Sequence, residues 1–161
     1  MISQIKLQEI CKKYNLKYEK IVAKNENILN YGEEKDICER IEYLKSELEI
    51  ESKNIEKCPS SLYFSTFKNI KNNWEYLKER KIEELNVRSC LHILASESTE
   101  LKKIYTYIEE NYGISYLNEN TSILKVDINR IKEIESTFVN LNKKQIVQAS
   151  ISDFDINGLK K

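Results

Sequence analysis

The sequence predicts an all-α fold, a right- or left-handed α-solenoid of about four repeats in the order helix, helix, 3₁₀ turn. The first observation is a recurring phrase: Ile-Glu-Tyr-Leu-Lys at residues 41–45 returns as Trp-Glu-Tyr-Leu-Lys at residues 74–78. Cys58 follows the first phrase after thirteen residues, and Cys90 follows the second after twelve. Self-similarity at a period near 32 residues is typical of stacked helical repeats.

Four apolar columns extend the repeat in both directions from this phrase. Their members are separated by 30 to 33 residues: Leu29, Leu62, Leu94 and Leu124; Ile37, Ile70, Leu101 and Ile131; Leu44, Leu77, Ile108 and Phe138; Ile50, Ile82, Ile114 and Ile146. With only one Pro and three Gly, the chain also has few residues for the tight turns of an all-β fold.

The length of 161 residues suits one helical-repeat domain over 1–161 with a single core. We expect an N-terminal cap unit, four repeats and a polar tail, at 1–29, 30–62, 63–94, 95–124, 125–152 and 153–161. No apolar run approaches the roughly 20 residues that span a bilayer, and the first residues do not have the pattern of a signal peptide. The expected location is therefore cytoplasmic, with no membrane contact.

Within each repeat, the apolar spacing predicts a long amphipathic helix and then a shorter one. Ile37, Ile41, Leu44 and Leu48 follow helical spacing, as do Ile70, Trp74 and Leu77, and Leu101, Tyr105, Ile108 and Tyr112. Short apolar segments follow at 50–55, 82–87 and 114–117, and 5–29 forms an atypical first unit. Ser65 or Thr66, Ser98 and Asp127 are the candidate N-caps of the long helices.

The segment 55–65, Ile-Glu-Lys-Cys-Pro-Ser-Ser-Leu-Tyr-Phe-Ser, leads into a predicted long helix over 69–78. Here the chain resembles the mitochondrial transcription termination factor (mTERF) family over about residues 20–142. Pro59 and Leu62 match the family's Pro followed three residues later by Leu. The resemblance implies a curved solenoid of helix, helix and 3₁₀ units that binds DNA, RNA or ribonucleoprotein, and it does not imply catalysis.

Lysines and tyrosines at fixed repeat positions are the candidate binding residues. On the long helices they form two sets: Lys45, Lys71, Lys78, Lys102 and Lys132 on one flank, and Tyr43, Tyr76 and Tyr107 on the other. A lysine stripe can contact phosphates, and tyrosines can stack on unpaired bases. The alternatives are a solvated lysine face and tyrosines that pack between repeats.

A protein partner is the second functional hypothesis. The chain has 26 basic and 26 acidic residues, whereas nucleic-acid binders usually carry a basic excess. An acidic belt lies in the first repeat: Glu33, Glu34, Asp36, Glu39, Glu42, Glu47, Glu49 and Glu51. Such a belt suits an adaptor or inhibitor that engages a basic, nucleic-acid-handling protein. The alternative is an ordinary solvated helix surface.

No residue pattern predicts catalysis, a cofactor, a metal or a small-molecule substrate. Cys11, Cys38, Cys58 and Cys90 form no closely spaced pair, so we interpret them as core thiols. His92 is the only histidine and is expected to be a half-buried structural residue. Residues 153–158 copy the first half of an EF-hand loop without its twelfth-position Glu, so the expectation is a polar tail.

Overall fold

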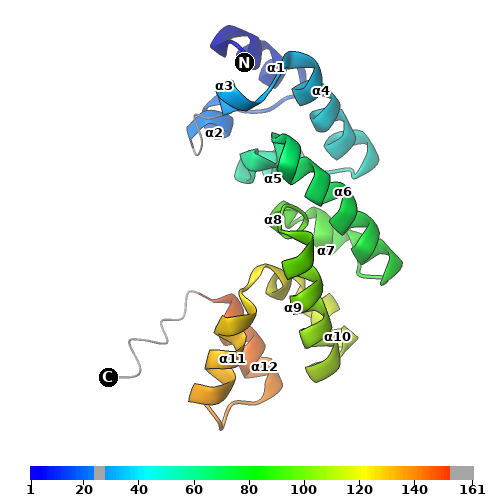
Figure 1. Ribbon diagram of the computed structural model, residues 1–161, viewed down its shortest axis with the longest axis vertical. Coiled ribbons are helices and arrows are strands. Elements are labelled where there is room, and N and C mark those ends of the chain that lie inside the picture. The colour runs from blue at the N-terminus through cyan, green and yellow to red at the C-terminus, as the bar shows by residue number, and fades with distance from the viewer. Residues whose placement is uncertain (24–27, 153–161) are drawn as a thin grey trace. The chain divides into compact units, whose positions relative to one another are not determined.

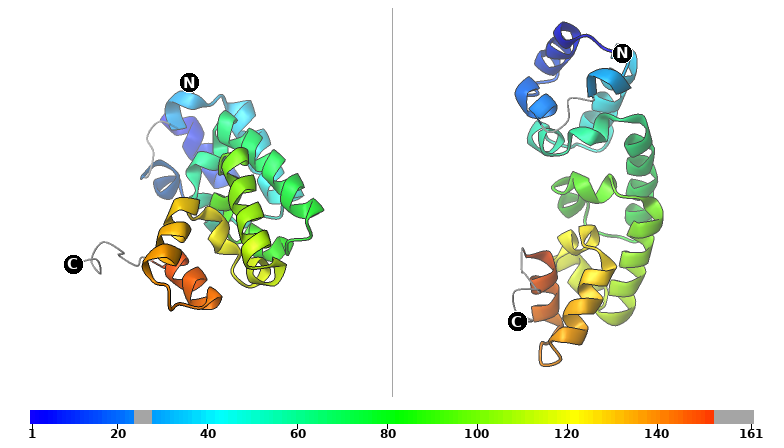
Figure 2. Two further views of the ribbon diagram at one scale, coloured as in Figure 1. Left: turned by 60° about the horizontal axis from the view of Figure 1, so that its bottom comes forward. Right: turned by 60° about the vertical axis from the view of Figure 1, so that its left-hand side comes forward.

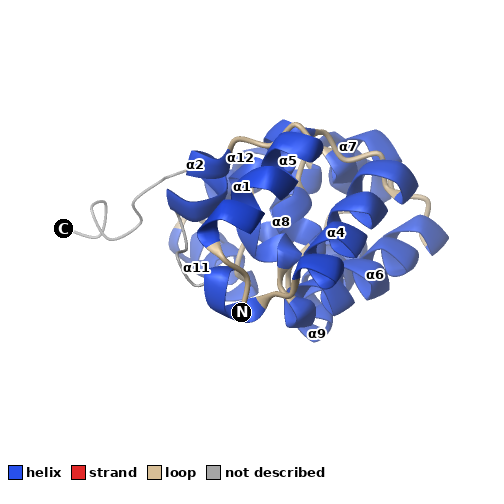
Figure 3. Cartoon of the chain, turned by 90° about the horizontal axis from the view of Figure 1, so that it is seen from above, coloured by secondary structure: helices blue, strands red, loops and turns tan. Residues whose placement is uncertain are grey.

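The computed structural model describes residues 1–23 and 28–152, and every regular element in these ranges is helical, with no strand (Figure 3). This confirms the all-α prediction. The chain forms two compact units, Met1–Glu97 and a second that begins at Ser98. No helix in the described ranges is long and apolar enough to cross a membrane.

The first unit contains eight described α-helices and two other helical turns (Figure 1). The α-helices are α1 (Gln4–Lys13), α2 (Tyr18–Ala23), α3 (Ile28–Tyr31), α4 (Glu34–Glu42), α5 (Ser52–Lys57), α6 (Phe64–Glu79), α7 (Glu84–Arg88) and α8 (Leu91–Leu94). A π-helical turn, η1 (Tyr43–Glu47), continues α4, and a 3₁₀ turn, η2 (Pro59–Leu62), precedes α6. Helix α6 contacts the turn η2, which precedes it in the sequence, and the one-turn helix α8, which follows α7.

The second unit begins with the long helix α9 (Ser98–Asn111), followed by α10 (Ile114–Glu119) and the 3₁₀ turn η3 (Thr121–Lys125). The last two described helices, α11 (Ile128–Thr137) and α12 (Lys143–Ile151), lie side by side (Figure 2). Both α9 and α12 contact η3, and α9 also contacts α11. The turn η3 therefore lies in the middle of this unit's packing.

One backbone conformation recurs where each short helix meets the turn that follows it. Cys58 and Cys90 both have φ −129°, with ψ 67° and 71°, and Asn120 has φ −134° and ψ 54°. The carbonyl of each residue accepts a hydrogen bond from the amide three residues later, with N···O distances of 3.1, 3.0 and 2.9 Å. The column that contains the two cysteines thus shares a backbone geometry as well as a residue type.

The long helices α4–η1 and α6 end in the same way, through a residue in the left-handed region. Glu49 has φ 54° and Lys81 has φ 58°. The next residue then donates its amide back into the helix, from Ile50 to the Leu44 carbonyl and from Ile82 to the Leu77 carbonyl. This is the bond of a Schellman motif, in which the residue after the left-handed one is usually apolar. It explains why an isoleucine column follows each long helix.

The π-helical turn accounts for a one-residue difference in spacing after the two copies of the recurring phrase. Thirteen residues separate Lys45 from Cys58, but only twelve separate Lys78 from Cys90. A π-turn accommodates one additional residue within a helix. The closing bond correspondingly spans six residues from Ile50 to Leu44, and five from Ile82 to Leu77. The sequence contained this signal, but the location of the extra residue was not predicted.

Most members of the predicted apolar columns lie in the two cores, but Leu29 and Phe138 are only half-buried. Ile37, Ile70, Leu101 and Ile131 are all buried, whereas Ile114 is 42% exposed and its predicted burial was wrong. The helix closure in α9 uses Gly113, whose amide donates to the Ile108 carbonyl at 3.0 Å. By this closing bond, Gly113 occupies the position after α9 that Ile82 occupies after α6, and Gly113 has φ 92°. Ile114 is therefore one residue beyond the position at which the column residue is buried.

The N-cap predictions gave one success and two errors. Asp127 accepts a hydrogen bond from the amide of Asn129 at 2.7 Å and caps α11 as predicted. Ser65 and Thr66 lie inside α6, which begins at Phe64 after Tyr63. Ser98 is the first residue of α9 rather than its cap, and its buried hydroxyl has no hydrogen-bond partner. Apolar spacing located these helices but not their first residues.

Candidate functional site

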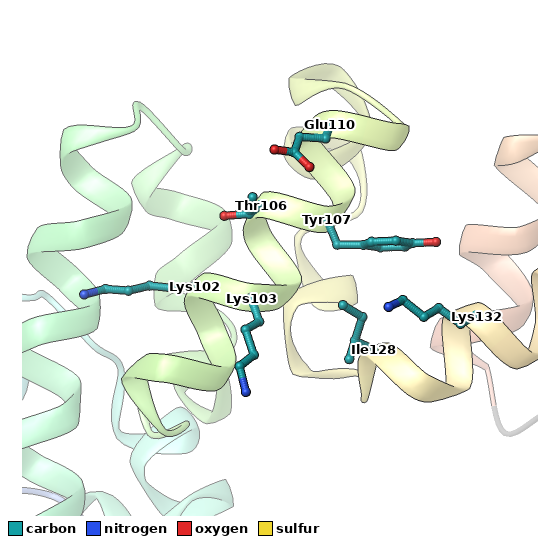
Figure 4. Close-up of a pocket in the computed structure, with 7 residues that line it drawn as sticks. All are labelled: Lys102, Lys103, Thr106, Tyr107, Glu110, Ile128 and Lys132. Atoms are coloured by element: carbon teal, nitrogen blue, oxygen red, sulfur yellow. The ribbon is translucent and has the colours of Figure 1, made fainter.

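A basic hollow in the second unit is the candidate site. It has a volume of about 560 Å³ and lies between α9 and α11 (Figure 4). Its lining residues are Lys102, Lys103, Thr106, Tyr107, Glu110, Ile128 and Lys132. Three of these, Lys102, Tyr107 and Lys132, are among the predicted site residues. We call this feature the α9–α11 hollow.

Helical spacing places the lining residues on one face of each helix. On α9 they fall at 102, 103, 106, 107 and 110, while Leu101, Ile104 and Ile108 face the core. On α11, Ile128 and Lys132 are four residues apart and point toward α9 (Figure 4). The amphipathic pattern that buries one face of α9 therefore turns the other face toward the hollow.

Two contacts position the Tyr107 side chain, one at its hydroxyl and one over the face of its ring. Its hydroxyl donates to Glu135 Oε2 at 2.6 Å, and Lys132 Nζ lies 5.2 Å from the ring centroid. Tyr112, which is only 8% exposed, donates its hydroxyl to Glu135 Oε1, also at 2.6 Å. One carboxylate thus fixes two phenols, and the orientation of the Tyr107 ring does not depend on a ligand.

Burial and the Glu135 charge keep both phenols protonated. Partial burial, with the hydrogen bond to Glu135 and its charge, raises the pKa of Tyr107 to about 12. The pKa of Tyr112 is also raised, first by burial and then by the same carboxylate. Tyr107 is therefore a neutral aromatic group at physiological pH.

The charges around the hollow favour an anion. Its lining contains three lysines and one glutamate. Lys103 also pairs with Glu100, outside the lining, at 3.0 Å between two exposed side chains. Exposed pairs of this kind contribute little stability and exchange easily with another anion. The site thus combines positive charge with the face of a tyrosine.

The first unit contains a second lysine against aromatic rings. Lys71 Nζ lies 5.0 Å from the ring centroid of Tyr43 and 4.9 Å from that of Phe67. The two rings meet edge to face with centroids 5.2 Å apart. The sequence placed lysines and tyrosines on opposite flanks of a helix. In both units the tyrosine flank of one long helix instead meets the lysine flank of the next.

The other predicted residues lie elsewhere in the first unit. Lys45 is half-buried, and its Nζ donates to the Tyr14 carbonyl at 2.9 Å and to Ser52 Oγ at 2.6 Å. Two of its three N–H donors are thus used within the fold. Lys78 is exposed at the end of α6. Tyr76 is half-buried under the guanidinium of Arg80, whose Cζ lies 3.5 Å from the ring centroid.

Sequence reasoning missed four residues of the hollow and the carboxylate behind it. Lys103, Thr106, Glu110 and Ile128 line the hollow, and Glu135 anchors Tyr107. The lining residues on α9 share the helical face of Lys102, so the helical period alone was enough to find them. Glu135 lies 28 residues from Tyr107, and its role depends on how α9 and α11 pack.

The thiols and the histidine differ in burial. Cys11 and Cys58 are buried, as expected of core thiols, whereas Cys38 and Cys90 are half-buried. His92 is exposed, and its predicted half-burial was wrong. Leu91 and Ile93, on either side of it in the short helix α8, occupy the inward positions.

Much of the acidic belt is engaged within the first unit. Partners of its carboxylates are Lys6 for Glu34, Lys35 for Glu39, the Tyr14 hydroxyl for Glu42, Arg88 for Glu49 and Lys53 for Glu51. Opposite charge from the same fold therefore offsets part of the belt. The paired carboxylates are exposed, so these contacts are weak and leave the surface accessible.

In the part of the chain that the structure describes, no group of three His, Cys, Asp or Glu side chains is arranged to hold a metal ion. The EF-hand-like residues 153–158 lie outside the described ranges. No protein-family model, curated protein or solved structure matches this chain.

Proposed function

We propose that this protein is a non-enzymatic helical-repeat module that binds nucleic acid, DNA or RNA, through the α9–α11 hollow. The observation that supports it is that Lys102, Lys103 and Lys132 line the same hollow as Tyr107, with Lys132 Nζ over the Tyr107 ring. Lysines neutralise phosphates and release counterions, which supplies most of the affinity of proteins that bind nucleic acid without sequence specificity. A tyrosine face adds contact area that any base can use.

The repeat architecture is part of this proposal. We infer an mTERF-like solenoid in which each repeat comprises a long helix, a short helix and a one-turn element. The shared backbone conformation at Cys58, Cys90 and Asn120 supports it, as do the matching closures after α4–η1 and α6. Three of the four repeats would then offer a lysine after the first residue of the long-helix column, at Lys71, Lys102 and Lys132, whereas the first repeat has Cys38 there. Lys71 is the corresponding contact in the first unit.

The direct test is a binding titration of the full-length protein. Fluorescence anisotropy with labelled single-stranded and duplex DNA and RNA, at two salt concentrations, measures both affinity and its salt dependence. We expect affinity to fall steeply as salt rises, with a slope set by the number of phosphates contacted. Lys102→Glu combined with Lys132→Glu should weaken binding to every sequence and lower the salt slope by about 2.

A matched pair of lysines provides the control. Lys125 and Lys144 are exposed in the same unit but do not line the hollow. Replacing both by glutamate changes the net charge by the same amount as the test variant. Equal losses in the two double variants would show that only net charge matters, and the assignment to the hollow would be wrong.

The absence of salt-sensitive binding by the wild-type protein would reject the nucleic-acid function. A protein partner would then be the leading hypothesis, with the acidic belt as its surface. The carboxylates of this belt that have partners remain exposed, so a basic protein can still reach them. Recovery of partners from the native host with wild-type and charge-reversed belts would test that function.

A further inference from the structure

The Tyr107 ring combines two properties that a ligand can use. Its orientation is fixed by the hydrogen bond from its hydroxyl to Glu135, and it forms part of the wall of a hollow. Ile128 adds apolar surface from α11, and Figure 4 shows this side chain beside Lys132 on the side that faces α9. A pre-oriented aromatic group loses little conformational entropy when a planar ligand stacks on it.

The hollow is wide open to solvent and has a volume of about 560 Å³. It can take a planar group against the Tyr107 ring without enclosing it. Paired bases are stacked inside a duplex, with the sugar–phosphate backbone outside, and they can reach an aromatic ring in a hollow only by leaving the stack. An unpaired base is already available to stack on such a ring.

We propose that the α9–α11 hollow recognises unpaired nucleotides, with a base stacked against Tyr107 and the adjoining phosphates on Lys102 and Lys103. Lys132, which now lies over the ring, moves aside and contacts a phosphate of the same strand. The ligand class is therefore single-stranded RNA or DNA. This inference rests on the proposed function, because it assumes that nucleic acid occupies the hollow.

The first experiment separates stacking from charge and uses only the wild-type protein. The probes are a labelled single strand and an abasic strand with the same number of phosphates. Since the phosphates are equal, both strands should show the same salt slope. Stacking should make the base-bearing strand bind about 5- to 150-fold more tightly for one stacked base, and annealing it to its complement should abolish this gain.

Two outcomes distinguish this inference from the proposed function. If the two strands bind with equal affinity, or if the duplex keeps the full gain, stacking at an unpaired base is wrong, while the nucleic-acid function stands. If neither single strands nor duplexes bind with salt dependence, the proposed function is wrong and the inference fails with it.

Variants of Tyr107 assign the stacking to this ring. Tyr107→Leu should remove the preference for the base-bearing strand, and Tyr107→Phe, which keeps the ring, should restore it. Tyr116 is half-buried in the same unit outside the hollow, so Tyr116→Leu is the matched control and should retain the preference. Loss in Tyr116→Leu equal to that in Tyr107→Leu would overturn the assignment. The strand comparison remains decisive if Tyr107→Leu does not fold.

Discussion

Asn73 donates both hydrogens of its amide side chain to backbone carbonyls, to Leu94 at 2.8 Å and to Ser96 at 2.8 Å. The same relationship occurs 33 residues earlier in the chain, where Arg40 Nη1 donates to the Leu62 carbonyl at 2.6 Å. In both cases a buried polar residue on a long helix satisfies the carbonyl that ends the following one-turn element. The period that relates the apolar columns therefore also relates these polar contacts.

Replacing Asn73 should be costly because its side chain is fully buried. Asn73→Leu removes both donors and leaves the Leu94 and Ser96 carbonyls without these partners. An unpaired buried carbonyl costs about 1–3 kcal/mol, so the free energy of unfolding should fall by about that amount. Urea unfolding measures the loss. Asn72→Leu, at the exposed neighbouring position, is the control and should change stability by less than about 0.5 kcal/mol.

Lys81 should be replaceable by glycine with a gain in stability. It has φ 58° after α6, a conformation that costs an L-residue about 1–2 kcal/mol and costs glycine almost nothing. After the entropy loss of glycine, we expect Lys81→Gly to stabilise the protein by about 0.5–1 kcal/mol. Lys78→Gly, inside α6, should instead destabilise by about 1 kcal/mol. If both variants unfold at a lower temperature than the wild type, the assigned helix closure is wrong.

Deletion of Ser46 tests the interpretation of the π-helical turn. Ser46 is exposed within η1, and removing one residue there should allow the helix to continue with α-helical bonds. The free energy of unfolding should change by less than about 1 kcal/mol. The matched deletion of Glu79, the last residue of α6, shifts the closing residues Lys81 and Ile82 by one position, about 100° around a helix without such a turn, and should destabilise by about 2 kcal/mol or more. Urea unfolding of both variants makes the comparison.

Alkaline pH should destabilise the protein through groups whose pKa is raised in the folded state. Burial raises the pKa of the Cys11 thiol from 9.0 to about 11, and the pKa of Tyr107 rises from 10.0 to about 12. A raised folded-state pKa contributes stability that is complete below the unfolded value and is lost as pH rises toward the folded value.

We therefore expect a constant contribution below about pH 9 and a progressive loss from pH 9 to 12. Urea unfolding across this range measures the loss, and phenolate absorbance follows the tyrosines directly. Tyr107→Phe should reduce the loss above pH 10, because a phenylalanine has no proton to release. The same slope in the variant and in the wild type would show that Tyr107 does not contribute.

Local pattern was sufficient to predict the helical character and most of the core. Ile37, Ile70, Leu101 and Ile131 were located by spacing alone, and all four are buried. The failure at Ile114 has a specific cause, because closure through Gly113 shifts the register by one residue. A column drawn at constant spacing cannot represent such a shift, since the shift depends on how the preceding helix ends.

The sequence by itself determined that the described chain is helical, which faces of its helices are apolar and which carry lysine and tyrosine. These properties follow from the period of 3.6 residues per turn, which is local to each helix. Only the tertiary structure decided that Lys132 lies over Tyr107, that Glu135 anchors this ring and that Lys45 is used within the fold. Each of these contacts joins residues at least 25 positions apart, so it exists only after hydrophobic burial has packed one helix against another.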